Sequence, residues 1–283
     1  MQVKGFYKKL LMLFAGFSFL HFPASAQYNE VGILVGGSTY KGELAPQLFK
    51  TDFNHLAGGV FFRHNWNRHW SWKVAINYGK VSGDDAYSEY GFERDRNLSF
   101  YSNVLDISPL IEFNFFPYET GNYYYPFTPY LFTGISVFKF NPMAQLNGEE
   151  YELQPLTTEG QRPYKRLQLA VPIGGGIKFS VGRIGIGLEI GARRAYTDYL
   201  DDVSTVYPDL GILLANKGAA AVALSDRSFS SMDSTNTISG SYLKQRGNAQ
   251  DKDWYLFGGV TLYFRLTSLL RDICKPFKNR RYI

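Results

Sequence analysis

Cys274 is the residue whose chemistry is most easily read from the sequence, because it is the only cysteine of the chain. If the protein is exported, a lone thiol in an oxidising compartment would either form an intermolecular disulfide or remain a bystander. The surrounding segment mixes cations with apolar side chains and could dock on an acidic, partly apolar partner surface. It could equally be a solvated terminus or contact anionic lipid headgroups. The predicted partner-binding residues are Cys274, Arg271, Lys275, Phe277, Lys278, Arg280 and Arg281.

A second group of residues, Asp198, Asp201 and Asp202, could supply oxygen ligands to Ca²⁺. The simpler interpretation is that these carboxylates accept hydrogen bonds in a turn, so we predict no metal site. His64 and His69 flank a predicted turn without further ligands nearby. No Ser/His/Asp triad and no carboxylate pair stands out, and Gly174–Gly176 lacks the lysine of a phosphate-binding loop. We therefore predict a protein that is not an enzyme and needs no cofactor.

The N-terminal segment has the features of a secretory signal peptide. Three lysines precede an apolar run from Leu10 to Phe22, and Ala24-Ser25-Ala26 matches a cleavage site. The run is too short for a membrane span. We expect a signal peptide over 1–26 and a mature chain that starts at Gln27.

Removal of this segment changes the charge balance. The whole chain carries 30 basic and 25 acidic residues, and three of the lysines belong to the first 26 residues. The remaining net charge of +2 is the sum of +4 in residues 266–283 and −2 in the rest of the mature chain. The basic character therefore belongs to two short ends, and we predict no nucleic-acid partner.

The mature chain shows the alternation of strands and not the periodicity of helices. In 184–193, for example, isoleucine and leucine alternate with Gly185, Gly187, Glu189 and Gly191. The same analysis predicts eight strands over 28–40, 54–66, 70–80, 102–116, 127–140, 167–180, 183–195 and 253–265. Long and short connections alternate between them, which is typical of outer-membrane barrels. Residues 208–216 and 219–227 of the longest connection are predicted to form short helices.

A sheet in hydrocarbon has to close, because unpaired edge groups have no water to bind there. We therefore predict an all-β, eight-stranded antiparallel up-and-down transmembrane β-barrel of the outer membrane over 27–265. The charged residues predicted to face its lumen and pair there are Arg63, Lys73, Glu112 and Glu189. A soluble barrel with an apolar interior is the alternative, and the strand lengths and aromatic clusters argue against it.

The clusters Trp66, Trp70 and Trp72, and Tyr118 and Tyr123–Tyr125, are predicted to lie at the level of the lipid headgroups. Because an even number of strands returns both ends to the side of the short turns, we expect those turns and the tail 266–283 to be periplasmic. The long connections would then be extracellular.

Several segments resemble a family of outer-membrane barrels of Bacteroidota. These are Tyr28–Gly32, Tyr196–Ser204, Tyr207–Asp209, Leu224–Ser228 and Asp253–Tyr255. The basic, cysteine-bearing tail most resembles that of a component of the type IX secretion system. The resemblance implies a membrane anchor for a periplasmic ring, which consists of a lipoprotein and its soluble partner. It also implies no catalytic residue and makes Cys274 and the tail the candidate ring contact. A barrel that binds or admits a small apolar ligand through a lateral gap is the alternative.

Overall fold

The computed structural model describes residues 27–45, 54–228 and 244–266. The predicted signal peptide (1–26) and the segment 267–283, with Cys274 and the other predicted partner-binding residues, lie outside the described residues. The last described strand ends at Leu266.

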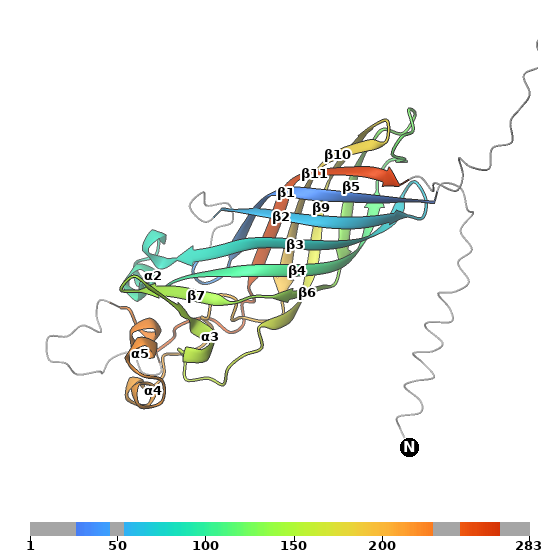
Figure 1. Cartoon of the computed structure of the whole chain (residues 1–283). Coiled ribbons are helices and arrows are strands. Elements are labelled where there is room, and N and C mark those ends of the chain that lie inside the picture. The colour runs from blue at the N-terminus through green and yellow to red at the C-terminus, as the bar shows by residue number, and fades with distance from the viewer. Residues whose placement is uncertain (1–26, 46–53, 229–243, 267–283) are drawn as a thin grey trace, which may run out of the picture.

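The described chain is an antiparallel barrel, shown in Figure 1. In this part of the chain, eight wall-forming strands, which we call staves, pair in one ring, and pairing of β3 with β4 closes it. Two of the elements, β5 and β6, follow each other in a single stave that is interrupted at Ile135. The staves are β1 (Tyr28–Lys41), β2 (His55–Asn65), β3 (Trp70–Asp84), β4 (Ser99–Asn114), β5 (Phe127–Gly134) with β6 (Ser136–Lys139), β9 (Leu167–Val181), β10 (Ile184–Ala195) and β11 (Trp254–Leu266). The predicted fold class and its eight staves are confirmed.

Both chain ends of the barrel lie on the side of the short turns, because Asn29 of β1 is opposite Leu266 of β11. We call this side the turn end. The opposite end carries a cap, which we define as residues 42–45, 85–98, 140–166, 196–228 and 244–253. It contains the helical segments η2 (Asp85–Tyr87), α2 (Gly91–Arg96), α3 (Leu153–Leu156), α4 (Leu210–Lys217) and α5 (Ala219–Ser225) and the hairpin of β7 (Pro142–Leu146) and β8 (Glu149–Glu152).

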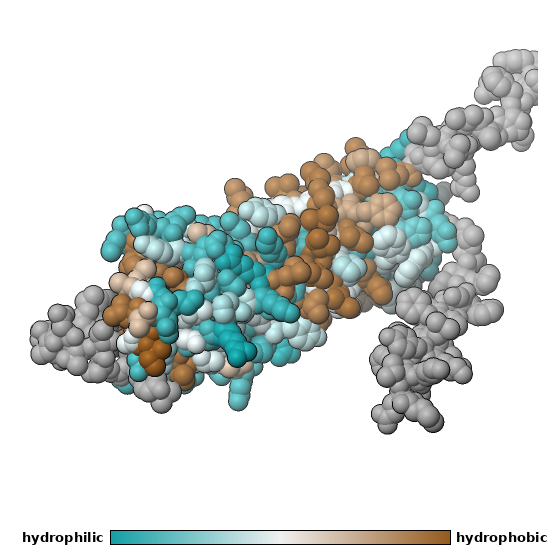
Figure 2. Space-filling view, turned by 60° about the horizontal axis from the view of Figure 1, so that its bottom comes forward, coloured by the Kyte–Doolittle hydropathy of each residue, from teal (hydrophilic) through white to brown (hydrophobic). Residues whose placement is uncertain are grey.

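The outer face of the barrel carries exposed apolar side chains on its staves, and Figure 2 shows one side of this ring as a brown band between teal surfaces. Outward side chains alternate with inward ones along each stave, as in β10, where Leu188 is exposed while Glu189 is buried. A closed sheet with such an exterior is suited to acyl chains, since no edge group is left unpaired. We call this ring the belt; it includes Ile33, Val35, Val60, Ile76, Ile107, Ile111, Leu131, Ile173, Ile186, Leu188, Ile190, Val260 and Leu262. None of the described helices is long and apolar enough to span a membrane.

The aromatic residues at the turn end divide into two groups. Trp70, Tyr123 and Tyr124 are exposed, and the two tyrosine rings lie edge to face with centroids 5.9 Å apart. Tyr118 is different, and its prediction as a headgroup-level residue is wrong. Its side chain is only 1% exposed and its hydroxyl lies 2.7 Å from that of Tyr263, inside the barrel. The chain after β4 folds inward and carries this ring into the lumen.

The cap is more regular than the sequence suggested. Strands β3 and β4 remain paired as far as Asp84 and Ser99, beyond the ends predicted for them. The predicted helix over 208–216 is confirmed as α4; the side chain of Asp209 accepts a hydrogen bond from the backbone N–H of Ile212, and Gly218 follows with φ 84°. The hairpin of β7 and β8 lies in a segment that was predicted to be a loop, and it extends the sheet by pairing β7 with β4.

Candidate functional site

The lumen on the side of the turn end is filled by paired charges. Arg63, Lys73, Glu112 and Glu189 point inward from four staves, as their position in the alternating pattern requires. Two further residues complete the group: Glu30 on β1 and Lys178 on β9. Among the described residues this group therefore contains three carboxylates and three cations, each of which is buried. We call it the lumen network, consisting of Glu30, Arg63, Lys73, Glu112, Lys178 and Glu189.

Glu112 is the centre of the lumen network. Its Oε1 lies 3.1 Å from Nζ of Lys73, and its Oε2 lies 2.6 Å from Nζ of Lys178 and 2.8 Å from Nε of Arg63. The other two carboxylates each take one of these cations: Nη1 of Arg63 lies 2.8 Å from Glu30, and Nζ of Lys73 lies 2.6 Å from Glu189. Buried charges are tolerated when they are paired and hydrogen-bonded in this way.

Aromatic rings cover the lumen network and leave little space around it. The Arg63 guanidinium lies 4.9 Å from the centroids of both Phe61 and Tyr263. Nζ of Lys178 lies 4.1 Å from the centroid of Tyr130, whose hydroxyl donates to Glu189 at 2.5 Å. Cations are attracted to ring faces, so these contacts add to the ion pairs.

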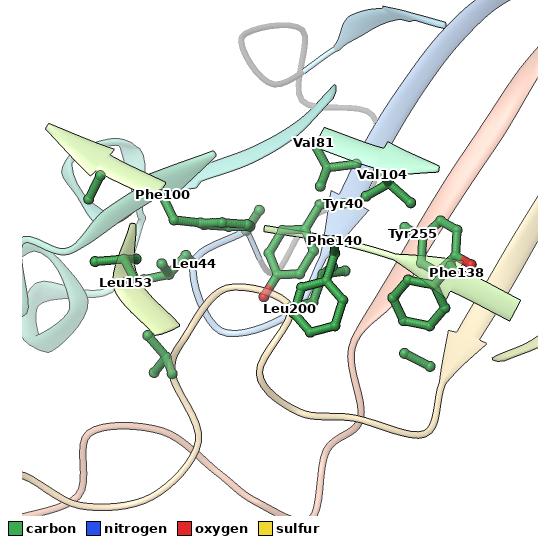
Figure 3. Close-up of a cluster of buried hydrophobic side chains, with 14 of the residues drawn as sticks. Tyr40, Leu44, Val81, Phe100, Val104, Phe138, Phe140, Leu153, Leu200 and Tyr255 are labelled. Carbon is green, nitrogen blue, oxygen red and sulfur yellow. The ribbon is translucent and has the colours of Figure 1, made fainter. Parts of the chain in front are cut away.

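The lumen toward the cap is filled differently, by the apolar cluster in Figure 3. Tyr40, Phe138 and Tyr255 project from the staves, while Leu153 and Leu200 come from the cap. The cap therefore inserts its own apolar side chains into the mouth of the barrel. The lumen network fills the side of the turn end and this cluster fills the side of the cap, so the described part of the lumen is a packed interior.

A second group of charged residues lies where the cap meets the barrel. Of the three aspartates considered for Ca²⁺, the structure brings Asp201 together with two residues that the sequence analysis did not consider, Glu43 and Asp253. The charge of Asp198 raises the pKa values of all three. The carboxylate oxygens of Glu43, Asp201 and Asp253 include atoms that all lie within 4.8 Å of one another. Asp202 is separate, because its carboxylate accepts hydrogen bonds from the hydroxyls of Thr158 and Tyr164. We call Glu43, Asp198, Asp201 and Asp253 the carboxylate cluster.

Burial and mutual repulsion favour the protonated forms of these acids. Burial, and then the charge of Asp201, raises the pKa of Glu43 to about 9. Burial raises the pKa of Asp201 to about 7 and that of Asp198 to about 6. The pKa of Asp253 is raised by burial and by the charge of Asp201. The cluster can thus hold protons or a cation, whereas the lumen network already contains its own counter-charges.

Some of these residues were detectable from the sequence. Glu30 and Lys178 have the same parity as the other inward residues of their strands, so the alternation that identified Glu189 could have identified them. Glu43 and Asp253 carry no such signal, because they lie in connections that are 210 positions apart in the chain and meet only in the folded cap.

Comparison with solved structures finds small outer-membrane barrels. The N-terminal β-barrel domain of Pseudomonas aeruginosa OprF is 10% identical, with 85% of this chain and 100% of that chain covered and a TM-score of 0.35. Neisserial surface protein A is 7% identical, with 85% and 97% covered and a TM-score of 0.39. A major outer membrane protein from Thermus thermophilus is 11% identical, with 85% and 100% covered and a TM-score of 0.39.

Comparison by sequence gives a more direct assignment. None of the curated proteins matches the chain. A family model for a domain of unknown function, DUF6089, matches residues 7–213, which is more than half of the 283 residues. The chain therefore belongs to the DUF6089 family.

Proposed function

We propose that this protein is a non-enzymatic barrel of the outer membrane that anchors a periplasmic assembly of a protein secretion machine. The observation that carries the proposal is the packed lumen: the lumen network and the apolar cluster leave the barrel suited to anchoring and not to conduction. The sequence resembles PorG, a component of the type IX secretion system, and this resemblance supports the choice of machine.

The belt supports the membrane location. Lipid-facing charges cost about 2–4 kcal/mol for arginine or lysine at the bilayer midplane, and the belt residues are apolar while the charges of Arg63, Lys73 and Lys178 lie inside. In the proposed orientation the turn end faces the periplasm and the cap faces the cell exterior, as in other barrels with short and long connections.

The partner would then meet the turn end. Tyr123 and Tyr124 are 91% and 82% exposed there, and exposed aromatic side chains are common anchors of interfaces. Leu266, the last described residue of β11, is paired with Asn29 at the same end of the barrel. We propose that the segment with Arg271, Cys274 and Lys275 and the turn that contains Tyr123 together contact the periplasmic lipoprotein and its soluble partner.

Deletion of residues 267–283 in the native host tests the proposal. We expect export of secreted cargo to be lost while the barrel remains in the outer membrane, because β11 is retained in full. A chain in which the same residues are replaced by a neutral Gly/Ser segment of equal length is the matched control for length. Export at the normal level in the deletion strain would refute the anchoring role.

The thiol is tested separately. Non-reducing electrophoresis of outer membranes should show a species of higher mass that is absent in Cys274→Ser. If the species is absent from the wild type, the covalent part of the proposal is wrong, and the non-covalent contact is still tested by the deletion.

The alternative function, binding of a small apolar ligand, is favoured by one observation. A hollow of ≈620 Å³ lies on the barrel wall where β1, β9, β10 and β11 are rich in glycine, and Gly37, Gly175, Gly258 and Leu188 are among its lining residues. Gly258→Val would partly fill this hollow. If Gly258→Val impairs the function while deletion of 267–283 does not, ligand binding is favoured over anchoring.

A further inference from the structure

The carboxylate cluster lies where three separate segments of the chain meet. Glu43 belongs to the turn that follows β1, Asp198 and Asp201 follow β10, and Asp253 precedes β11. Gly42 allows the first segment to approach the others, since a Cβ there would overlap the hydroxyl of Tyr40 and Oδ1 of Asp253. Anything that binds these carboxylates would fasten the cap to the rim of the barrel.

Hydrogen bonds satisfy only part of the cluster. The hydroxyl of Tyr40 lies 2.5 Å from Oδ2 of Asp201 and 3.0 Å from Oδ1 of Asp253. Backbone N–H groups donate to the remaining oxygens, from Val203 to Asp201 and from Leu200 to Asp253. Two other oxygens are shielded from solvent and have no hydrogen-bond partner among the described residues: Oδ1 of Asp198 and Oε2 of Glu43.

The orphaned oxygen of Asp198 is a separate sign of a missing ligand. The Asp198 side chain is only 3% exposed, and its Oδ2 is held by the hydroxyl of Ser204. Its negative charge raises the pKa values of Glu43, Asp201 and Asp253, so the Asp198 carboxylate lies near that group. A buried carboxylate oxygen without a partner is rare in native proteins and calls for an explanation such as an ion.

The charges of Arg96 and Lys252 lower the pKa values of Asp201 and Asp198, but both cations make their hydrogen bonds to other groups. Nε and Nη2 of Arg96 each lie 2.7 Å from an oxygen of Asp85. Nζ of Lys252 donates to the backbone carbonyl of Ala249. Within residues 27–45, 54–228 and 244–266, no ion pair joins a lysine or arginine to any of the four carboxylates. This contrasts with the lumen network, where every carboxylate has a cation within 3.1 Å.

We propose that Glu43, Asp198, Asp201 and Asp253 bind one divalent cation of the Ca²⁺ type between the cap and the barrel. Ca²⁺ takes six to eight oxygen ligands at about 2.3–2.6 Å and accepts carboxylates in irregular arrangements. Zn²⁺ would prefer nitrogen or sulfur ligands, and the described histidines contact Ser82, Asn29 and Asn114 instead. The site is independent of the anchoring role proposed above.

An ion can reach this position from outside. Glu43, but none of the other three carboxylates, lines two clefts of the cap surface, of ≈530 Å³ and ≈490 Å³. Because Glu43 is only half-buried while Asp201 and Asp253 are fully buried, it would be the residue through which the ion enters and leaves.

Equilibrium dialysis with ⁴⁵Ca²⁺ tests the proposal on the full mature chain, folded in detergent and stripped with EDTA. The purified protein is used because lipids of the membrane also bind Ca²⁺. We expect saturable binding of one ion per chain, weakened at least about tenfold in Glu43→Gln and in Asp198→Asn. Glu89→Gln is the matched control, since it removes the same charge from an exposed position of the cap and should bind as the wild type does.

Two outcomes would overturn the proposal: no saturable binding by the wild type, or binding that is unchanged in both variants. Migration of unheated samples in SDS gels shows whether each barrel is folded. Glu43→Gln keeps the test decisive if Asp198→Asn fails to fold, because Glu43 is half-buried and the amide oxygen of glutamine can still accept the hydrogen bond from the backbone N–H of Asn248. A wild type that holds the carboxylates by protons alone would show no bound Ca²⁺ at neutral pH, which also refutes the site.

Discussion

The lumen network and the carboxylate cluster both bury several ionisable side chains, but only the lumen network contains its own counter-charges. The lumen network combines three carboxylates with three cations, and Glu112 alone contacts Arg63, Lys73 and Lys178. The carboxylate cluster gathers acids only. A buried charge is costly unless a counter-charge accompanies it, so the first region is complete by itself and the second depends on protons or an ion.

The two regions also differ in whether their counter-charges can be exchanged with solvent. The lumen network joins staves within the belt, where a polar group without a partner would face hydrocarbon or a dry core. The carboxylate cluster joins the cap to the rim, where solvent is near and the partner can come and go. We therefore expect substitutions in the lumen to affect the whole barrel and substitutions in the cluster to affect the cap.

Glu112→Gln should produce the largest effect, because it removes the negative charge shared by three buried cations. Breaking a buried pair costs about 3–5 kcal/mol of unfolding free energy. The measurement is urea unfolding in detergent, with Glu89→Gln as the control for loss of an exposed carboxylate. A loss no greater than that of the control would show that the lumen network is not what stabilises the barrel. Combining Glu112→Gln with Lys178→Met should cost less than the sum of the two single changes, since they share one interaction.

Tyr40→Phe should have the next largest effect. It removes the one hydroxyl proton that lies between Asp201 and Asp253, and a buried oxygen that loses its donor costs about 1–3 kcal/mol. The ring contact with Phe100, at 5.0 Å between centroids, is retained. Hydrogen exchange of the cap segments would show the loss, and Ca²⁺ should restore part of the protection. The matched variant Tyr130→Phe should cost less, because Glu189 keeps its pairing with Lys73; a larger cost at Tyr130 would contradict the comparison.

The strand pattern of the sequence was enough to predict the barrel, since alternation places each side chain on one face without knowledge of its neighbours. The lumen residues Arg63, Lys73, Glu112 and Glu189 were placed by the same alternation. The hairpin of β7 and β8 was missed although its signal was present. Asn147-Gly148 is a typical two-residue hairpin turn, and both residues have positive φ in the structure.

Other features could not have been predicted by local pattern. Tyr118 lies in a turn, where alternation does not apply, and only the closed barrel shows that its ring fits inside. Glu43 and Asp253 meet because two connections fold over the same rim. The sequence analysis considered Asp198, Asp201 and Asp202 together for Ca²⁺ and preferred turn hydrogen bonds. In the structure the carboxylate of Asp202 turns away toward Thr158 and Tyr164.

The stability of the cap in EDTA should fall as the pH rises from about 4 toward neutral. Unfolded aspartate and glutamate have pKa values of about 3.9 and 4.3, while burial raises the pKa of Asp198 to about 6, of Asp201 to about 7 and of Glu43 to about 9. The folded cap therefore holds more protons than the unfolded one in this range, and stability decreases with pH. Limited proteolysis at pH 5 and pH 8 measures this.

Saturating Ca²⁺ should remove this decline, because the ion replaces the protons as the counter-charge; at a concentration of 100 times its dissociation constant it would contribute about 2.7 kcal/mol. Glu43→Gln in EDTA should show a shallower decline, since one titrating group is gone. Equal resistance to protease at both pH values in EDTA would mean that these acids are accommodated by another partner.

Arg166→Gln should change the unfolding free energy least, because it breaks an ion pair that is partly exposed to water. Nη2 of Arg166 lies 2.6 Å from Oε2 of Glu152, which is shorter than most ion pairs of the lumen network, but the two side chains are 26% and 46% exposed. Water screens such a pair, so its loss should change the unfolding free energy by about 0–1 kcal/mol. Urea unfolding of this variant beside Glu112→Gln therefore asks whether distance or burial determines the strength of an ion pair. A loss at Arg166 as large as that at Glu112 would mean that distance decides, and the contrast between the two buried regions would then lose its physical basis.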